Sequence, residues 1–312
     1  TILSAANAVI ARNPDRRDKS LWTAAGDGPQ VVGYVADNEH DEAAFVAGEI
    51  DRLVDNSEIR NCDVAVFYRT NAQSRVFEDV FLRVGLPYKV VGGVRFYERR
   101  EIRDALAYLR VLSNPDDTVS LRRILNVPKR GIGDRAEELV AQYADRERIS
   151  FAAALRVAAE QPERMGALAT RSQRCIAGFV RMLDGLAELV EQGEGTAELL
   201  EAIYARTGYT SELEASDDPQ DASRLENLAE LVTVAREFAG DAAVADLAVE
   251  EAVENAGLAP ADDATGEPEP GSLAAFLERV ALVADADSIP DNDEGMVTLM
   301  TLHTAKGLEF PV

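Results

Sequence analysis

The sequence has few cysteines and no long apolar run, and both absences narrow the class of protein. Only Cys62 and Cys175 occur among 312 residues, which favours unpaired thiols in a reducing compartment over a disulfide-stabilised secreted fold. No apolar run approaches the roughly 18 residues of a membrane helix, and the first residues lack a signal-peptide pattern. We therefore expect a cytoplasmic protein with no membrane partner.

Recognisable catalytic sets are also missing. No GxxxxGK[ST] phosphate loop occurs, no acidic strand end is typical of a magnesium site, and no metal-ligand spacing is present. A serine, cysteine or paired-carboxylate catalytic set cannot be assembled either. We predict no metal ligands, and we do not expect this chain alone to hold and cleave a magnesium nucleotide.

Negative charge is abundant but unevenly distributed. The net charge is −24, yet 28 of the 56 acidic residues lie between Gly185 and Gly295, together with only 4 of the 32 basic residues. The segment from Arg95 to Arg135 carries 10 basic and 6 acidic residues. Binding follows local potential, so a basic face for nucleic acid stays open, while the acidic half is explained by a solvated surface.

Strand and helix patterns alternate in the first third of the chain. Strands are predicted at 30–36, 63–68 and 87–93, and helices at 39–55, from Thr70 to Gly85 and at 98–112. This order predicts a mostly parallel sheet. Helical patterns then continue until a strand returns at 296–302. We therefore predict an α/β domain made of residues 1–113 and 295–312, interrupted by an inserted all-helical domain at 114–294.

The strongest predicted strand delivers an aromatic and a basic residue at its carboxyl end. Tyr68 could stack on a base, and Arg69 could stabilise the charge of a transferring phosphate. The alternative is a packed tyrosine beside an arginine that pairs with a carboxylate.

The last fifteen residues form a second candidate, a buried strand followed by a polar turn. His303 and Thr304 could meet a nucleic-acid backbone, and Glu309 could hydrogen-bond a ribose hydroxyl. Parallel sheets bind ligands at such strand ends. A purely structural histidine is the alternative.

A third candidate is the glycine-rich turn that precedes the helix predicted at 134–146. Glycines allow a close approach to phosphate, and the turn adds two cations. Its candidate DNA-binding residues are Lys129, Arg130, Gly131, Ile132 and Gly133. A tight turn between helices with solvated basic residues is the alternative, and a solvated face with salt bridges is expected for Arg95, Arg99, Arg100 and Arg103.

Four motifs in order carry a family resemblance: YRTNAQSR, GGVRFYERREIRDALAYLR, NVPKRGIG and TLHTAKGLEFPV. Together they resemble the UvrD/PcrA/Rep family of superfamily 1 DNA helicases. The resemblance implies most of the second RecA-like domain, a parallel sheet with helices on both faces, with its helical insertion. No part of this sequence resembles the first RecA-like domain of that family, which carries the phosphate loop and the magnesium-binding carboxylates.

The resemblance also implies roles for the candidate residues. Tyr68 would stack on adenine, Arg69 would be the catalytic arginine finger, Glu309 would bind the ribose, and His303 would touch single-stranded DNA. Residues 129–133 would hold duplex DNA. The implied activity is a 3′→5′ DNA helicase of DNA repair that uses ATP with Mg²⁺, with repair or transcription proteins as further partners. The rival is a non-catalytic DNA- or protein-binding regulatory module.

Overall fold

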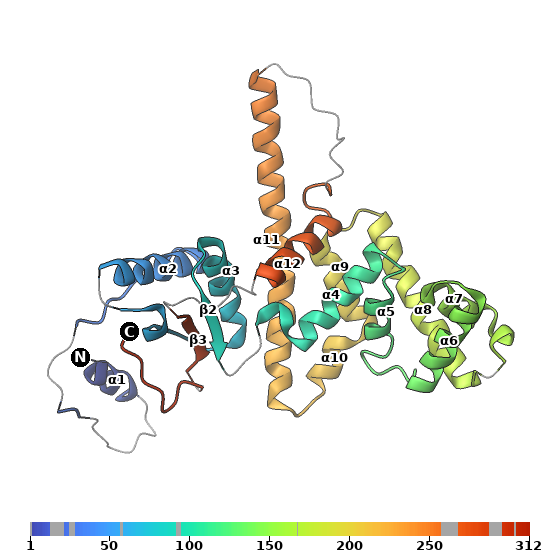
Figure 1. Ribbon diagram of the computed structural model, residues 1–312, viewed down its shortest axis with the longest axis horizontal. Coiled ribbons are helices and arrows are strands. Elements are labelled where there is room, and N and C mark those ends of the chain that lie inside the picture. The colour runs from blue at the N-terminus through green and yellow to red at the C-terminus, as the bar shows by residue number, and fades with distance from the viewer. Residues whose placement is uncertain are drawn as a thin grey trace.

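Two bodies of different architecture lie along the longest axis of the molecule (Figure 1). The computed structural model describes residues 2–12, 22–24, 29–56, 59–91, 95–166, 168–256, 268–286, 295–302 and 304–312. An α/β body carries both ends of the described chain, and a helical body fills the other end of the molecule.

The α/β body is made of elements from both ends of the sequence. It contains α1 (Ile2–Ile10), α2 (Glu39–Asn56), η1 (Asn61–Asp63), β1 (Ala65–Tyr68), η2 (Asn71–Gln73), α3 (Ser74–Val84), β2 (Tyr88–Val91) and β3 (Val297–Thr301). The three strands form a parallel sheet in the order β1-β3-β2. Among the described strands, β3 comes last in the sequence but lies between β1 and β2. The residues between β2 and β3 are therefore inserted into one sheet.

The core of the α/β body joins α2, α3 and the sheet in one hydrophobic cluster. In α3, Val76, Phe77, Val80 and Phe81 repeat at helical spacing and are buried against the other elements. Gly85 ends this helix at a φ of +75°, where its N–H is bonded to the carbonyls of the last turn. The helical periodicity of the sequence therefore correctly predicts which face of α3 is buried.

The helical body has its own hydrophobic cluster. Its elements are η3 (Phe96–Glu98), α4 (Arg100–Ser113), α5 (Thr118–Ile124), α6 (Asp134–Glu147), α7 (Phe151–Glu160), η4 (Pro162–Met165), α8 (Thr170–Glu191), α9 (Thr196–Thr207), α10 (Tyr209–Glu214), α11 (Pro219–Ala256) and α12 (Leu273–Ala286). Figure 1 shows α11 extending well beyond the rest of this body.

The predicted fold class, a parallel α/β sheet interrupted by an all-helical insertion, is confirmed. The division at residue 113 stays a prediction, but packing places α4 with the helical body. Ile102, Leu106 and Leu109 are almost completely buried in the helical cluster. By this criterion the helical body begins near Phe96.

The prediction of a strand at 30–36 is wrong, because these residues form no strand in the structure. Val31, Val32 and Val35 are exposed, although Tyr34 stacks on Phe45 of α2 with ring centroids 3.9 Å apart. A strand needs a neighbour for its N–H and C=O groups. The apolar residues at 30–36 have a propensity for strand structure, but no strand among the described residues pairs with them.

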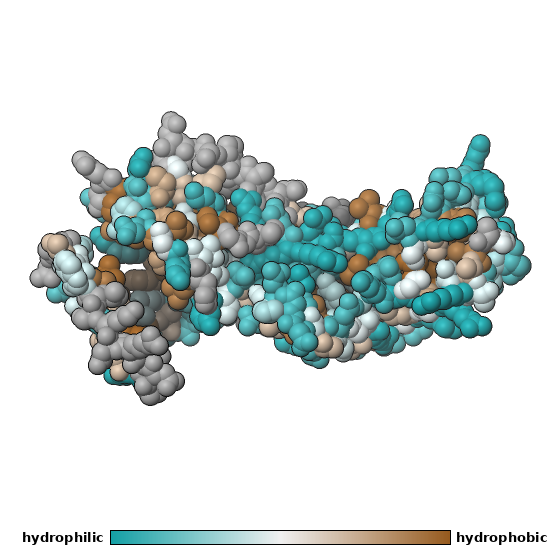
Figure 2. Space-filling view, turned by 90° about the horizontal axis from the view of Figure 1, so that it is seen from below, coloured by the Kyte–Doolittle hydropathy of each residue, from teal (hydrophilic) through white to brown (hydrophobic). Residues whose placement is uncertain are grey.

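The surface of the two bodies differs in polarity. Figure 2 shows hydrophilic residues over most of the visible face of the helical body, and hydrophobic ones gathering on the α/β body. Exposed large apolar residues of the α/β body include Val32, Phe67, Val84, Leu302 and Leu308. Within the described ranges, no helix has both the length and the apolar character to cross a membrane.

Candidate functional site

The two segments predicted to carry nucleotide contacts lie at the same edge of the sheet. Tyr68, the last residue of β1, is in register with Thr301, and the Leu302 N–H donates to the Tyr68 carbonyl at 3.0 Å. The rings of Phe67 and Phe310 meet edge-to-face with centroids 6.0 Å apart. The chain after residue 303 therefore folds back beside the end of β1. This is the edge where parallel sheets present ligand-binding groups.

Tyr68 is buried at this edge, with 5% of its surface exposed. Burial, and then the negative charge of Glu78, raise the pKa of Tyr68 to about 12, so its hydroxyl stays protonated at neutral pH. Its ring faces other protein groups in this arrangement. Stacking on a base would require the covering groups to move.

The Arg69 side chain is exposed to solvent, and its backbone is held by a side chain of the following segment. The Arg69 and Thr70 N–H groups both donate to the Gln73 Oε1 atom, at 2.9 and 3.1 Å. Among the described residues, the Arg69 guanidinium has no hydrogen-bond or ion-pair partner. A guanidinium left free on a fixed backbone, at the carboxyl end of a parallel strand, is well placed to meet a phosphate.

The polar turn after β3 is tied back to its strand. The Thr301 hydroxyl accepts from the Thr304 N–H at 3.3 Å, and the Thr301 carbonyl accepts from the Ala305 N–H at 3.0 Å. Thr304 is half-buried, and Glu309 is exposed. His303, the predicted single-strand contact, lies outside the described residues. Glu309 follows the turn, in the segment that returns along β1 to the place where the Val312 N–H donates to the Asp63 carbonyl at 3.2 Å.

The glycine-rich turn lies in the helical body, between α5 and α6 (Figure 1), away from the sheet edge. Its side chains divide into two groups. Lys129, Gly131 and Gly133 are exposed, whereas Ile132 is buried and Arg130 is half-buried.

Arg130 holds the turn together from the inside. Its Nη1 atom donates to the carbonyls of Ile124 and Val127 at 3.0 and 2.8 Å, and its Nη2 atom donates to the Tyr108 hydroxyl. Its guanidinium also lies 5.3 Å from the centroid of the Phe179 ring. With these donors committed, Arg130 shapes the turn, and Lys129 is its exposed cation. DNA contact by any residue of the turn stays a prediction.

One group of residues that the sequence did not reveal lies between the two bodies. Arg75 of α3 has 3% of its side chain exposed and pairs with Asp79, Glu230 and Glu237 at 3.4, 2.8 and 2.9 Å. Arg99, expected on a solvated helix face, is instead buried between α3 and α11. That expectation was wrong because its partners are far away in the sequence. Local patterns carry no signal for such pairs.

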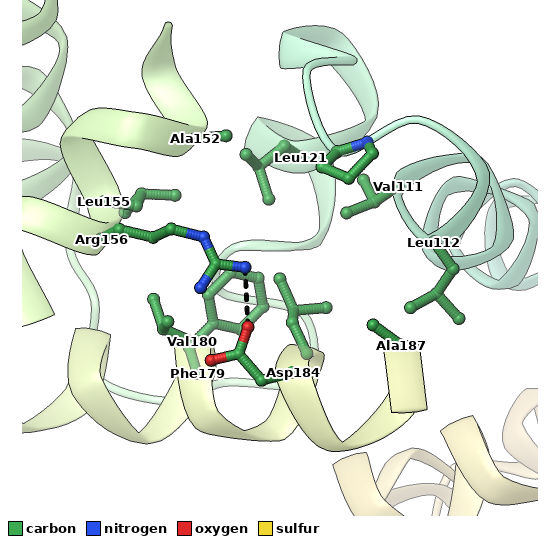
Figure 3. Close-up of a pocket in the computed structure, with 12 residues that line it drawn as sticks. Val111, Leu112, Leu121, Ala152, Leu155, Arg156, Phe179, Val180, Asp184 and Ala187 are labelled. Carbon is green, nitrogen blue, oxygen red and sulfur yellow. Dashed lines mark hydrogen bonds and ion pairs between the residues drawn. The ribbon is translucent and has the colours of Figure 1, made fainter. Parts of the chain in front are cut away.

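A group of polar side chains and an apolar pocket are two further features of the molecule. Glu39, His40 and Glu237 have potential metal-ligating atoms within 4.8 Å of one another, but the Glu237 carboxylate already accepts from Arg75. The apolar pocket in Figure 3, between the α4–α5 segment, α7 and α8, is closed on one side by the ion pair of Arg156 and Asp184 at 2.7 Å. Its cavity of about 60 Å³ is far too small for a nucleotide.

Comparisons with known proteins agree with the motifs. The family model described as the UvrD-like helicase C-terminal domain matches residues 1–312. The chain is 61% identical over 311 residues to the ATP-dependent DNA helicase UvrD1 of Mycobacterium tuberculosis. It is 40% identical over 316 residues to the ATP-dependent DNA helicase PcrA of Bacillus subtilis, and 40% identical over 312 residues to that of Staphylococcus aureus.

These alignments cover all of this chain but only 38% of each relative. The chain therefore spans a little over a third of the length of these relatives. The family resemblance read from the four motifs is confirmed. On the full-length match of the family model, the chain belongs to the UvrD-like helicase C-terminal domain family.

Proposed function

We propose that this chain is part of an ATP-driven 3′→5′ DNA helicase or translocase of DNA repair. Its α/β body supplies the second half of the ATP site, and its helical body binds duplex DNA. The family membership supports this proposal, as do the names of the relatives, which are ATP-dependent DNA helicases.

The observation that carries the proposal is the geometry at the sheet edge. Arg69 lies exposed on a backbone fixed by Gln73, directly after the point where β1 pairs with the last residues of β3, and Glu309 follows the turn after β3. This edge offers a cation for phosphate oxygens and a carboxylate for hydroxyl groups. In the described part of this edge there is no cradle of backbone N–H groups for phosphates, so ATP with its Mg²⁺ would be held mainly by residues outside this chain. The chain alone is expected not to hydrolyse ATP.

We assign to this edge the roles that the family resemblance implies. Arg69 stabilises the charge that develops on the transferred phosphoryl group, and Glu309 accepts a hydrogen bond from the ribose. Tyr68 stacks on adenine once its covering groups have moved. His303 and Thr304 contact the single strand along which the protein moves. The protein acts in the cytoplasm, consistent with the two unpaired cysteines.

The test is Arg69→Ala in the complete protein that contains this chain. Loss of an arginine finger lowers the rate of nucleotide hydrolysis by about 10³- to 10⁵-fold. We expect DNA-stimulated ATP hydrolysis to fall by such a factor while affinity for single-stranded DNA is retained. Arg83→Ala is the matched control, because Arg83 is also exposed on the α/β body but lies at the end of α3. Equal rates in the two variants would refute the catalytic role of Arg69.

The exposed side of the glycine-rich turn supports duplex binding by the helical body. Lys129 is its exposed cation, and the exposed Gly131 and Gly133 permit close approach to a phosphate. Lys129→Glu should weaken duplex binding and flatten its dependence on salt, because phosphate contacts release counterions. Arg146→Glu, the same change of charge at an exposed residue in the last turn of α6, is a suitable control. If affinity and salt slope are unchanged in Lys129→Glu, the turn has only a structural role.

The competing function, a non-catalytic DNA- or protein-binding regulatory module, shares the helical body but needs no ATP site. It predicts that Arg69→Ala is silent and Lys129→Glu is not. The two experiments therefore separate the proposals without any knowledge of the repair pathway.

A further inference from the structure

Arg99 lies at the joint between the two bodies. Arg99 is the residue between η3 and α4, close to the start of the helical body. Its side chain is buried, and desolvation lowers the pKa of Arg99. A guanidinium in such a place needs acceptors on every side.

The acceptors of Arg99 come from both bodies. On the α/β side, the Nη2 atom donates to the Asn71 carbonyl at 3.0 Å and to the Ser74 hydroxyl oxygen at 2.9 Å. On the helical side, the Nη1 atom donates to Asn227 Oδ1 of α11 at 2.8 Å. Arg99 therefore bridges α11 and the segment that follows β1.

Asn227 is itself fixed from the opposite direction. Its Nδ2 atom donates to the Glu101 Oε1 atom at 2.6 Å, and the residue is buried. With its amide bonded on both sides, Asn227 can hold Arg99 in only one orientation. A movement of α11 would therefore move the Arg99 guanidinium with it.

The segment held by Arg99 is the one that carries the candidate arginine finger. Asn71 begins η2, two residues after Arg69, and Gln73 of η2 accepts from the Arg69 and Thr70 N–H groups. α11 also packs directly on η2. A shift of η2 would therefore move the backbone of Arg69 with it.

We propose that Arg99 and Asn227 are positioning residues for ATP hydrolysis, which set the placement of Arg69 according to the seating of the helical body. The proposal rests on the proposed function of Arg69. It gives the helical body a second role: besides binding DNA, it completes the geometry of the ATP site through α11. Both side chains are buried, so we expect their effect in the rate and not in nucleotide affinity.

The experiment uses the complete protein and measures kcat and KM for ATP with saturating single-stranded DNA. Asn227→Ala removes the acceptor that α11 offers to Arg99 and should lower kcat by about 10- to 100-fold, the cost of a displacement near 1 Å in a catalytic site. The KM for ATP should change less than about twofold. Melting temperatures of all variants check that the fold is kept.

A reversed pair provides the rescue. In the double variant Asn227→Asp/Glu101→Gln, the new carboxylate still accepts from Arg99, and the new amide donates to it in place of the original one. We expect kcat within about threefold of the parent protein. Failure of this pair to restore kcat at normal melting temperature would contradict the proposed geometry.

A double-variant comparison tests whether Asn227 acts through Arg69. Under single-turnover conditions, Asn227→Ala should add little to the loss already caused by Arg69→Ala, because the residue it positions is gone. If the two losses multiply, or if Asn227→Ala leaves kcat unchanged, the proposal is overturned. If Arg69→Ala itself leaves hydrolysis intact, the proposed function fails as well, and the two failures are thereby distinguished.

A second variant and a direct measurement cover the case in which Asn227→Ala does not fold. Ser74→Ala removes one acceptor of Arg99 on the α/β side and should also lower kcat at unchanged KM. Amide hydrogen exchange should increase at residues 69–73 in either variant and stay unchanged in α2. Unaltered exchange at 69–73 in a folded variant would overturn the proposal.

Discussion

Replacing Arg75 by glutamine tests how strongly the contact between the two bodies depends on one buried cation. The guanidinium lies on α3, and two of its three carboxylate partners, Glu230 and Glu237, lie on α11. The third, Asp79, is one turn further along α3. Arg75→Gln leaves three clustered carboxylates without the cation that compensates them.

The expected loss of stability follows from the burial of these groups. Removing one partner of a buried ion pair costs about 3–5 kcal/mol, because the remaining charge stays desolvated. The side chains of Asp79, Glu230 and Glu237 retain 16, 21 and 31% exposure, so water can still reach them. We therefore expect the lower end of the range, about 3 kcal/mol of unfolding free energy.

Urea denaturation of this chain, followed by far-ultraviolet circular dichroism, measures the effect. The matched control is Arg156→Gln, since Arg156 pairs with Asp184 on the surface of the helical body, with side chains 51 and 42% exposed. An exposed pair of this kind contributes less than about 1 kcal/mol. Equal losses in the two variants would refute the idea that burial makes the Arg75 cluster important.

The same variant should make stability more sensitive to pH. Burial raises the pKa of Asp79 and of Glu230 above the ordinary values, and Arg75 opposes both shifts. A carboxyl with a raised pKa binds protons more tightly in the folded state, so its ionisation removes stability as pH rises through the interval between the ordinary and the raised pKa. Without Arg75 both values rise further. The loss caused by Arg75→Gln should therefore be smaller at about pH 5 than at pH 7.

Two further substitutions test single features of the fold. Gly295→Ala should destabilise the chain by about 2–4 kcal/mol, because Gly295 has a φ of +76° and an added Cβ would lie 2.7 Å from the Cys62 Cβ atom. A urea titration measures this loss, and adding Cys62→Gly to the same chain should recover part of it. Tyr108→Phe should cost about 1–2 kcal/mol, since the Val127 carbonyl and the Arg130 guanidinium lose a partner. Because the pKa of Tyr108 is raised to about 12, this second loss should be the same at pH 6 and pH 9, and a pH-dependent loss would contradict the assignment.

The parts of the fold that the sequence predicts well are those with a local signal. The helix that ends at Gly85 and the strand that ends at Tyr68 follow from periodicity and turn residues within one stretch of chain. The segment 30–36 shows the limit. Its valines have strand propensity, but a strand exists only through its neighbour, and propensity carries no information about that neighbour.

The candidate site divides in the same way. The rule that parallel strands end at one edge predicts that Tyr68 and the turn after Thr301 lie together, and the register confirms it. In the glycine-rich turn, the sequence treats Lys129 and Arg130 as equal cations. The structure separates them, because Arg130 donates to carbonyls of Ile124 and Val127 inside the turn. Charge is visible in a sequence, but the direction of a side chain is not.

The sequence could not predict the contact between the bodies for a further reason. The helix α11 makes contacts through two different faces. Leu228, Leu231 and Ala235 face the core of the helical body. Asn227, Glu230 and Glu237 follow another stripe of the same helix. Asn227 bonds to Arg99, and the two glutamates pair with Arg75 of the α/β body. In sequence, a polar stripe beside an apolar one is the ordinary pattern of a helix with one solvated face. Only the position of two arginines, more than a hundred residues earlier, turns that solvated face into a buried polar contact, and each of those arginines alone resembles a surface residue.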